Sequence, residues 1–165
     1  MNKALDKILL FIEEIGIHYQ LQEIAEDTFL PGLKLINGSL AIDINQLKYI
    51  GDVLHEAGHL ACMPPEIRRT MNDNLEDTDL HRGGEMMAMA WSYAACIHLE
   101  LDPHLVFHEN GYKGGGKNIV LNFQQGQYLG VPLLVWCGMC QMEDANNKSQ
   151  GFPVMLSWTC KQRPS

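Results

Sequence analysis

The intervals between apolar residues predict three helices in this chain. Over residues 3–15, apolar side chains recur every three or four positions, which is the period of a helix with one buried face. The same period returns over residues 45–61, with an asparagine placed to cap the start and a Pro-Pro pair beyond the end. Residues 85–101 are apolar on nearly all sides, which indicates a buried helix.

Shorter runs of apolar residues predict strands. Residues 17–21 alternate between apolar and polar, and the stretch "LKLINGSLAIDI" places two apolar runs around Asn37-Gly38, the strongest two-residue hairpin signal. We expect three antiparallel strands in this part of the chain. Residues 104–165 contain many glycines and short apolar runs such as "NIVLNF" and "VPLLVWC", which we expect to form turns and further short strands.

The expected fold class is therefore α+β. A small antiparallel sheet packs on the helix over residues 45–61 and on the buried helix over residues 85–101, and an additional β-rich segment follows at the C-terminal end. A length of 165 residues suits a single domain with one hydrophobic core. We expect residues 104–165 to pack as an extension on a core formed by residues 1–103.

Composition narrows the classes of partner. A formal net charge of -8 argues against nucleic acid and against anionic membranes as partners.

The first apolar patch, which ends at Glu13-Glu14, is too short for a signal-peptide core, so the expected compartment is the cytoplasm. An odd count of five cysteines then favours reduced thiols over a disulfide framework. The oligomeric state stays open.

Residues 55–59 read "HEAGH" within the second predicted helix. Because residues four apart lie on one face of a helix, His55 and His59 can hold a metal ion between them, and two imidazoles suit zinc. Zinc lowers the pKa of bound water to about 7, and Glu56 can reach that water as a general base. Gly58 costs about 1 kcal/mol relative to alanine inside a helix, which indicates that another group approaches closely there.

A catalytic zinc site also needs a third protein ligand and one open position. Glu85 is the preferred candidate, because a carboxylate at the start of a nearly all-apolar helix must be solvated, capping or bound to a positive group. In the alternative interpretation, Glu85 only complements the helix dipole in the first turn. His81, Asp77 and Asp79 are the substitutes for the third ligand.

The stretches "LAIDINQLKYIGDVLHEAGHLA" and "EMMAMAWSYAA" together resemble the ImmA/IrrE type of minimal gluzincin metallopeptidase domain. In that family a strand leads into the helix with HExxH, and a second helix supplies a glutamate in a pattern of the type E-x-x-A-x-x-F-A. The pattern is matched here by Glu85, Ala88, Trp91 and Ser92, with Trp in place of Phe and Ser in place of Ala. The resemblance covers about residues 5–101, whereas residues 104–165 match nothing recognisable.

The resemblance implies a zinc peptidase with His55, His59 and Glu85 as metal ligands and Glu56 as the base. The expected partner is a protein or peptide substrate, cleaved within the cell and paired in extended form with the strand Leu40 to Ile44. Such peptidases often have regulatory roles with narrow targets. The alternative is a non-catalytic protein that keeps this fold and uses its cleft to hold a partner, although such a protein has no need of Glu56.

Other residues carry weaker signals. Cys137 and Cys140 form a CxxC pair, which is more typical of buried core thiols than of a second metal site because only Cys160 follows it. Residues 111–116, with a run of three glycines, favour a flexible turn that closes over the site. The residues that could polarise a carbonyl or stabilise an oxyanion are His98, His104, His108, Tyr93 and Tyr112.

Overall fold

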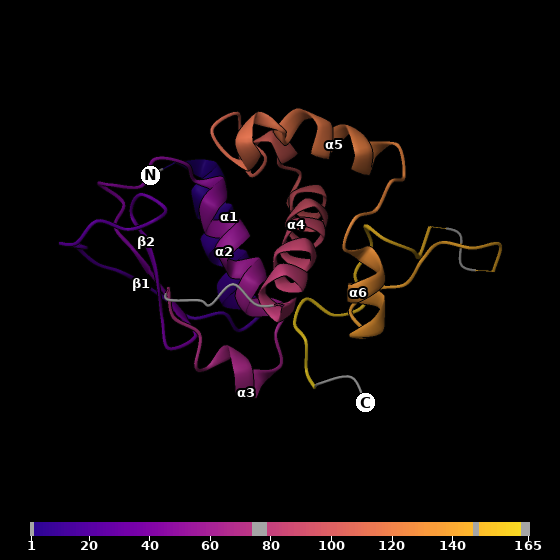
Figure 1. The fold of residues 1–165 in the computed structure, drawn as a ribbon, viewed down its shortest axis with the longest axis horizontal. Coiled ribbons are helices and arrows are strands. Elements are labelled where there is room, and N and C mark those ends of the chain that lie inside the picture. The colour runs from indigo at the N-terminus through magenta and orange to yellow at the C-terminus, as the bar shows by residue number, and fades with distance from the viewer. Residues whose placement is uncertain (1, 74–78, 147–148, 163–165) are drawn as a thin grey trace.

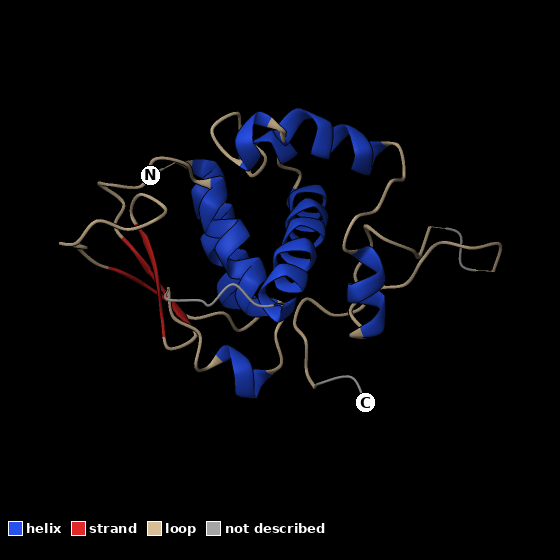
Figure 2. Cartoon of the chain, in the orientation of Figure 1, coloured by secondary structure: helices blue, strands red, loops and turns tan. Residues whose placement is uncertain are grey.

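The computed structural model describes residues 2–73, 79–146 and 149–162. In this part of the chain one helix precedes a small sheet, and further helices follow it (Figure 1; Figure 2). The α-helices are α1 (Lys3–Glu14), α2 (Gly51–Ala61), α3 (Pro65–Arg68), α4 (Asp79–Leu99), α5 (Gly116–Gln124) and α6 (Val131–Trp136). The strands are β1 (Tyr19–Leu21), β2 (Leu33–Ile36) and β3 (Ser39–Ile42), and two 3-10 helices are η1 (Pro103–Leu105) and η2 (Tyr112–Gly114).

The sheet is mixed, and the expectation of a purely antiparallel sheet is wrong. Its strand order is β1-β3-β2, in which β3 pairs antiparallel with β2 and parallel with β1. The predicted hairpin is present, with positive φ values of 47° at Asn37 and 80° at Gly38 that a two-residue turn requires. The loop after β1 carries the chain to the far edge of the sheet, so β3 enters between β1 and β2.

Helix α2 begins later than the apolar pattern predicts. Residues 43–47 form a turn around the carboxylate of Asp43, which accepts hydrogen bonds from the backbone N–H groups of Ile24 and Asn45 and from the side chain of Gln46. These bonds satisfy backbone donors outside a helix, so the helix starts only at Gly51. The apolar face expected from the sequence is kept, because Val53, Leu54, Ala57, Leu60 and Ala61 are all buried.

Helices α2 and α4 pack closely where Gly58 faces α4. A Cβ atom at Gly58 would lie 2.9 Å from the Trp91 ring and 3.3 Å from the Ala88 carbonyl oxygen. The close approach inferred from this glycine is therefore the contact between the two helices. Helix α4 is buried as predicted, and the Ser92 hydroxyl in its interior donates a hydrogen bond to the Ala88 carbonyl, 2.6 Å away.

The C-terminal segment is mainly helical and irregular, so the prediction of a β-rich segment is wrong. Among its described residues, strand pairing is limited to one isolated bridge between Cys140 and Met155. The run "NIVLNF" lies in α5, where Gly116, Val120 and Phe123 are buried at intervals of four and three. Short apolar runs fit a strand or a buried helix equally well, and here tertiary packing selects the helix.

In the described part of the chain, none of the helices combines the length and the apolar character needed to cross a membrane.

Candidate metal centre

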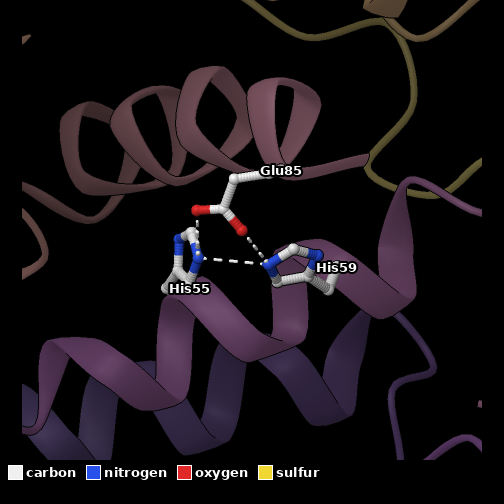
Figure 3. Close-up of side chains that lie close together, drawn as sticks. All are labelled: His55, His59 and Glu85. Atoms are coloured by element: carbon white, nitrogen blue, oxygen red, sulfur yellow. Dashed lines mark hydrogen bonds and ion pairs between the residues drawn. The ribbon is translucent and has the colours of Figure 1, made fainter. Parts of the chain in front are cut away.

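His55 and His59 lie one turn apart on α2 and point toward α4 (Figure 3). Their Nε2 atoms are 3.2 Å apart, and the two rings are nearly perpendicular at 89°. His55 is buried and His59 is partly buried. The helical spacing thus brings two imidazole nitrogens to one point at the edge of a cleft.

Glu85 reaches the same point from α4. Its Oε1 atom is 3.2 Å from the Nε2 of His55, and its Oε2 atom is 2.7 Å from the Nε2 of His59 (Figure 3). The ligand atoms of the three residues all lie within 4.8 Å of one another, so the group could hold a metal ion. Because α4 starts at Asp79, Glu85 lies beyond its first turn, which argues against a role in capping the helix dipole.

Electrostatic complementarity holds the three side chains together. Burial acts to raise the pKa of Glu85, but hydrogen bonds and charge interactions with His55 and His59 outweigh it and keep that pKa far below its ordinary value. Burial acts to lower the pKa of His59, yet the bonded Glu85 and the charge of Glu56 raise it overall. A cation placed among them would replace the proton on His59, since a metal and a proton compete for the same nitrogen.

Tyr112 supports His55 from the opposite side of the cleft. Its hydroxyl oxygen lies 3.0 Å from the Nδ1 atom of His55, and it is carried by η2 in the C-terminal segment. When the Nε2 atom of His55 binds a metal, the ring proton is on Nδ1. This N–H donates a hydrogen bond to the Tyr112 oxygen, which fixes the tautomer and the ring orientation. The structure thus gives Tyr112 a contact with one of the three ligand candidates.

Glu56 borders the same cleft as the three ligand candidates. Burial raises the pKa of its carboxyl group, while the positive charges of His59 and His55 act in the opposite direction. A carboxylate with a raised pKa is a better proton acceptor than an exposed one. The position and basicity of Glu56 therefore suit a general base.

The cleft has two hollows whose linings share Glu56 and Glu85. One of about 600 Å³ also borders Tyr49, Asp52 and Tyr112. The other, of about 240 Å³, has an apolar wall formed by the loop before β2 and by β2 itself, and its apolar residues are Phe29, Leu30, Leu33 and Leu35. Phe29 is 97% exposed, so it presents an apolar ring at the rim of both hollows.

Comparison with known proteins finds no match for the chain among protein-family models, curated proteins or solved structures. The geometry of this site is accordingly the main support for any function.

Besides Tyr112, His108 is the other sequence candidate for carbonyl polarisation that borders the cleft. Its Nε2 atom is 2.9 Å from an Asp52 carboxylate oxygen, and its ring stacks on Tyr49 with centroids 3.9 Å apart. Sequence reasoning missed Asp52 and Tyr49. Asp52 precedes His55 by three positions and so shares its helix face, a spacing that could have identified it.

The other candidates for carbonyl polarisation lie elsewhere. His98 packs against Phe11 and Trp158, His104 pairs with Asp102, and Tyr93 stacks on Phe123. The three have structural contacts and do not border the cleft. Among the substitutes for the third ligand, Asp77 lies outside the described residues, and Asp79 and His81 lie in α4 with side chains outside the description.

The expected pairing of a substrate with residues Leu40 to Ile44 does not fit the sheet. Strand β3 is paired on both edges, so it has no free backbone groups for another strand. The strand beside the cleft is β2, whose Leu33 and Leu35 line the smaller hollow. Even there, an Asp73 carboxylate oxygen accepts a hydrogen bond from the Leu35 N–H over 2.7 Å and occupies part of the outer edge.

Proposed function

We propose that the protein is a zinc-dependent peptidase that hydrolyses a peptide bond in a protein or peptide. The observation that carries this proposal is the convergence of the His55, His59 and Glu85 ligand atoms within 4.8 Å, at a cleft that Glu56 also borders. The resemblance of the two helical motifs to ImmA/IrrE-type gluzincin domains points to the same chemistry.

The ligand set fits zinc well. Two imidazoles and one carboxylate are the protein ligands of a known class of catalytic zinc sites, which keep a fourth position open for water or substrate. Here His55, His59 and Glu85 would hold the ion, and the contact with Tyr112 orients the imidazole of His55. When bound, zinc acts as a Lewis acid that acidifies water and polarises a carbonyl group.

Glu56 performs the proton transfers in this proposal. It takes a proton from the attacking water and then passes that proton to the nitrogen of the departing amine. Burial, which raises the pKa of this carboxyl group, strengthens it as the proton acceptor of the first step. Glu85, the other glutamate that lines both hollows, is bonded to both histidines, so Glu56 is the better candidate for this role.

The cleft also suits an extended peptide. Its two hollows adjoin at Glu56 and Glu85, so a chain that lies along both would pass its backbone over the proposed metal position. The apolar wall with Leu33 and Leu35 would take an apolar side chain next to the scissile bond. We infer a protein or peptide substrate within the cell, in line with the family resemblance.

The test compares wild type with Glu56→Gln after both are loaded with zinc. Hydrolysis of denatured casein or of a mixed peptide library should fall by at least about a hundredfold, because loss of a general base has that effect. Zinc content should be unchanged, since Gln keeps the size and removes only the charge. Glu14→Gln, at the exposed end of α1, is the matched control and should keep full activity.

Equal activity in Glu56→Gln would overturn the assigned mechanism. Bound zinc in wild type without hydrolysis of any peptide in the library would favour the non-catalytic binding protein instead.

A further inference from the structure

Two side chains of the irregular stretch 103–114 reach helix α2 at neighbouring points. The Nε2 atom of His108 lies 2.9 Å from a carboxylate oxygen of Asp52. The hydroxyl oxygen of Tyr112 lies 3.0 Å from the Nδ1 atom of His55. Because residues three apart share one face of a helix, Asp52 and His55 present these contacts to the same side, and all four residues line the larger hollow. The stretch is thus tied to α2 by two side chains.

His108 is bound in a way that leaves neither of its ring nitrogens free. Its Nε2 atom faces the carboxylate of Asp52, which is buried at 7% exposure. Its Nδ1 atom is buried and has no hydrogen-bond partner among the described residues. A proton on Nδ1 would therefore be buried without an acceptor, which favours a proton on Nε2 that is donated to the carboxylate. This leaves His108 no nitrogen for a substrate carbonyl group, so we look for its role in the contact with Asp52.

The ring of His108 is also packed on both its own turn and α2. It stacks on Tyr49, just before α2, with centroids 3.9 Å apart and planes at 16°. A Cβ atom at Gly111 would lie 3.2 Å from the ring, so the backbone there packs closely against His108. The Gly111 N–H donates to the His108 carbonyl over 3.1 Å and closes the turn. The ring and the turn 108–111 form one packed unit that leads directly into Tyr112.

Tyr112 has a backbone conformation that needs support from its surroundings. Its φ of 53° lies in the left-handed region, which bulky residues seldom adopt. Such residues persist where neighbouring contacts determine their conformation, and they are common at functional sites. The turn that begins at His108 sets the direction in which the backbone enters Tyr112. Without its anchor, this turn would let Tyr112 relax away from His55.

Backbone contacts hold the stretch on either side of this turn. A Cβ atom at Gly51 would lie 1.8 Å from the Leu105 carbonyl oxygen, and one at Gly116 would lie 2.3 Å from the Phe107 carbonyl oxygen. Between these contacts, residues 108–112 meet α2 through the side chains of His108 and Tyr112. Only a tight turn separates the two side chains, so their contacts with α2 should depend on one another.

We propose that His108 is a positioning residue, whose bond to Asp52 holds the Tyr112 hydroxyl against the Nδ1 atom of His55. The inference rests on the proposed function, because the contact with Tyr112 orients the imidazole of His55 for the metal ion. His108 touches neither the ion nor the substrate in this role and acts through Tyr112. The expected consequence is a zinc affinity that depends on His108 only while the Tyr112 hydroxyl is present.

A double-mutant cycle on zinc affinity tests this dependence. His108→Phe keeps an aromatic ring to stack on Tyr49 and removes both nitrogens. Zinc affinity, measured by competition with a fluorescent chelator, should fall about tenfold in this variant, as in Tyr112→Phe. The double variant should bind zinc as Tyr112→Phe does, within about a factor of two. Equal losses from His108→Phe with and without the Tyr112 hydroxyl would overturn the proposal, because they would show a structural role that is independent of Tyr112.

Two further variants separate the bond from general effects of substitution. His108→Gln offers an amide N–H to Asp52 and should recover most of the lost affinity. His104→Phe is the matched control, because His104 lies in the same stretch and makes the same kind of bond, 2.8 Å long, to the exposed Asp102 away from the cleft. It should bind zinc as wild type does.

Nuclear magnetic resonance of metal-free protein tests the geometry without zinc or activity. The rings of Tyr112 and His55, with centroids 5.9 Å apart, should give a nuclear Overhauser effect in wild type and in His104→Phe and lose it in His108→Phe. Asp52→Ala removes the same bond from the side of α2 and serves if His108→Phe does not fold.

An effect retained in the variants that lack the bond, or a zinc affinity unchanged by His108→Phe, would overturn the proposal. Wild type that binds no zinc would contradict the peptidase proposal instead, and the ring contact in metal-free protein would then decide whether His108 positions Tyr112.

Discussion

Two of the walls around the cleft are built in different ways. One wall consists of α2 and α4, two regular helices whose close packing at Gly58 brings His55, His59 and Glu85 together. The other wall is formed by residues 103–114, a stretch of short 3-10 helices and turns that contributes His108 and Tyr112. The candidate metal ligands come from the regular wall, and the residue that supports His55 comes from the irregular one.

The regular wall fixes where the candidate ligands lie, whereas the irregular wall contributes to the shape of the cleft. Three ligand atoms within 4.8 Å demand rigid supports, which two packed helices supply. The position of the irregular wall depends on its packing against α2. A Cβ at Gly51 of α2 would lie 1.8 Å from the Leu105 carbonyl oxygen, so the backbones of the two walls are in direct contact there. Changes in the two walls should therefore have distinguishable effects.

The largest expected effect comes from Glu85→Ala in the regular wall. Loss of one of three ligands should weaken zinc binding by more than about a hundredfold, because even loss of a group that only supports a ligand costs about 10–100-fold. Competition with a fluorescent chelator measures the affinity, and Glu14→Ala, an exposed glutamate at the end of α1, is the control. Unchanged affinity in Glu85→Ala would remove Glu85 from the ligand set.

A smaller effect is expected from Gly51→Ala at the contact between the walls. The added methyl group must displace η1, and overpacking of this kind lowers the free energy of unfolding by about 2 kcal/mol. Urea unfolding of metal-free protein measures it. Gly83→Ala in α4 is the control, because its Cβ would lie 3.9 Å from Leu133, an ordinary contact, and should be neutral or stabilising.

If Gly51→Ala were as stable as wild type, the two walls would not be tightly docked.

The smallest effect is expected from Tyr112→Phe in the irregular wall. The variant removes only the hydroxyl that faces Nδ1 of His55, so zinc affinity should fall about tenfold while the free energy of unfolding of the metal-free protein changes little. Tyr128→Phe, whose ring packs on Phe152, should leave the zinc affinity unchanged. Equal zinc affinities in wild type and Tyr112→Phe would mean that this contact does not support the ligand.

The regular wall is also the part that the sequence predicts best. Outside this wall, the first helix, the hairpin at Asn37-Gly38 and the α+β class are also confirmed. The structure brings together the three ligand candidates. Helical spacing places His55 and His59 on one face of their helix, and Glu85 stands out as a carboxylate in a strongly apolar helix. These are local signals, and local signals are what apolar periodicity and motif spacing report.

The sequence does not predict the sheet order, the helices that follow the irregular wall or the contact that this wall makes with His55. The parallel pairing of β1 with β3 depends on a loop that passes around the sheet. The helices α5 and α6 are formed by short apolar runs that fit a strand or a buried helix equally well. The contact between Tyr112 and His55 joins residues 57 positions apart, and no local pattern marks it.

By itself, the sequence determined the two helices and the spacing of His55 and His59, and it made Glu85 the preferred candidate for a third ligand. Such features depend on the backbone period of a helix, which each segment carries independently of the rest of the chain. Tertiary structure alone decided that β3 is closed on both sides and that Tyr112 rather than another tyrosine meets His55. Those outcomes depend on how distant segments pack, since burial and shape are shared properties of the whole fold.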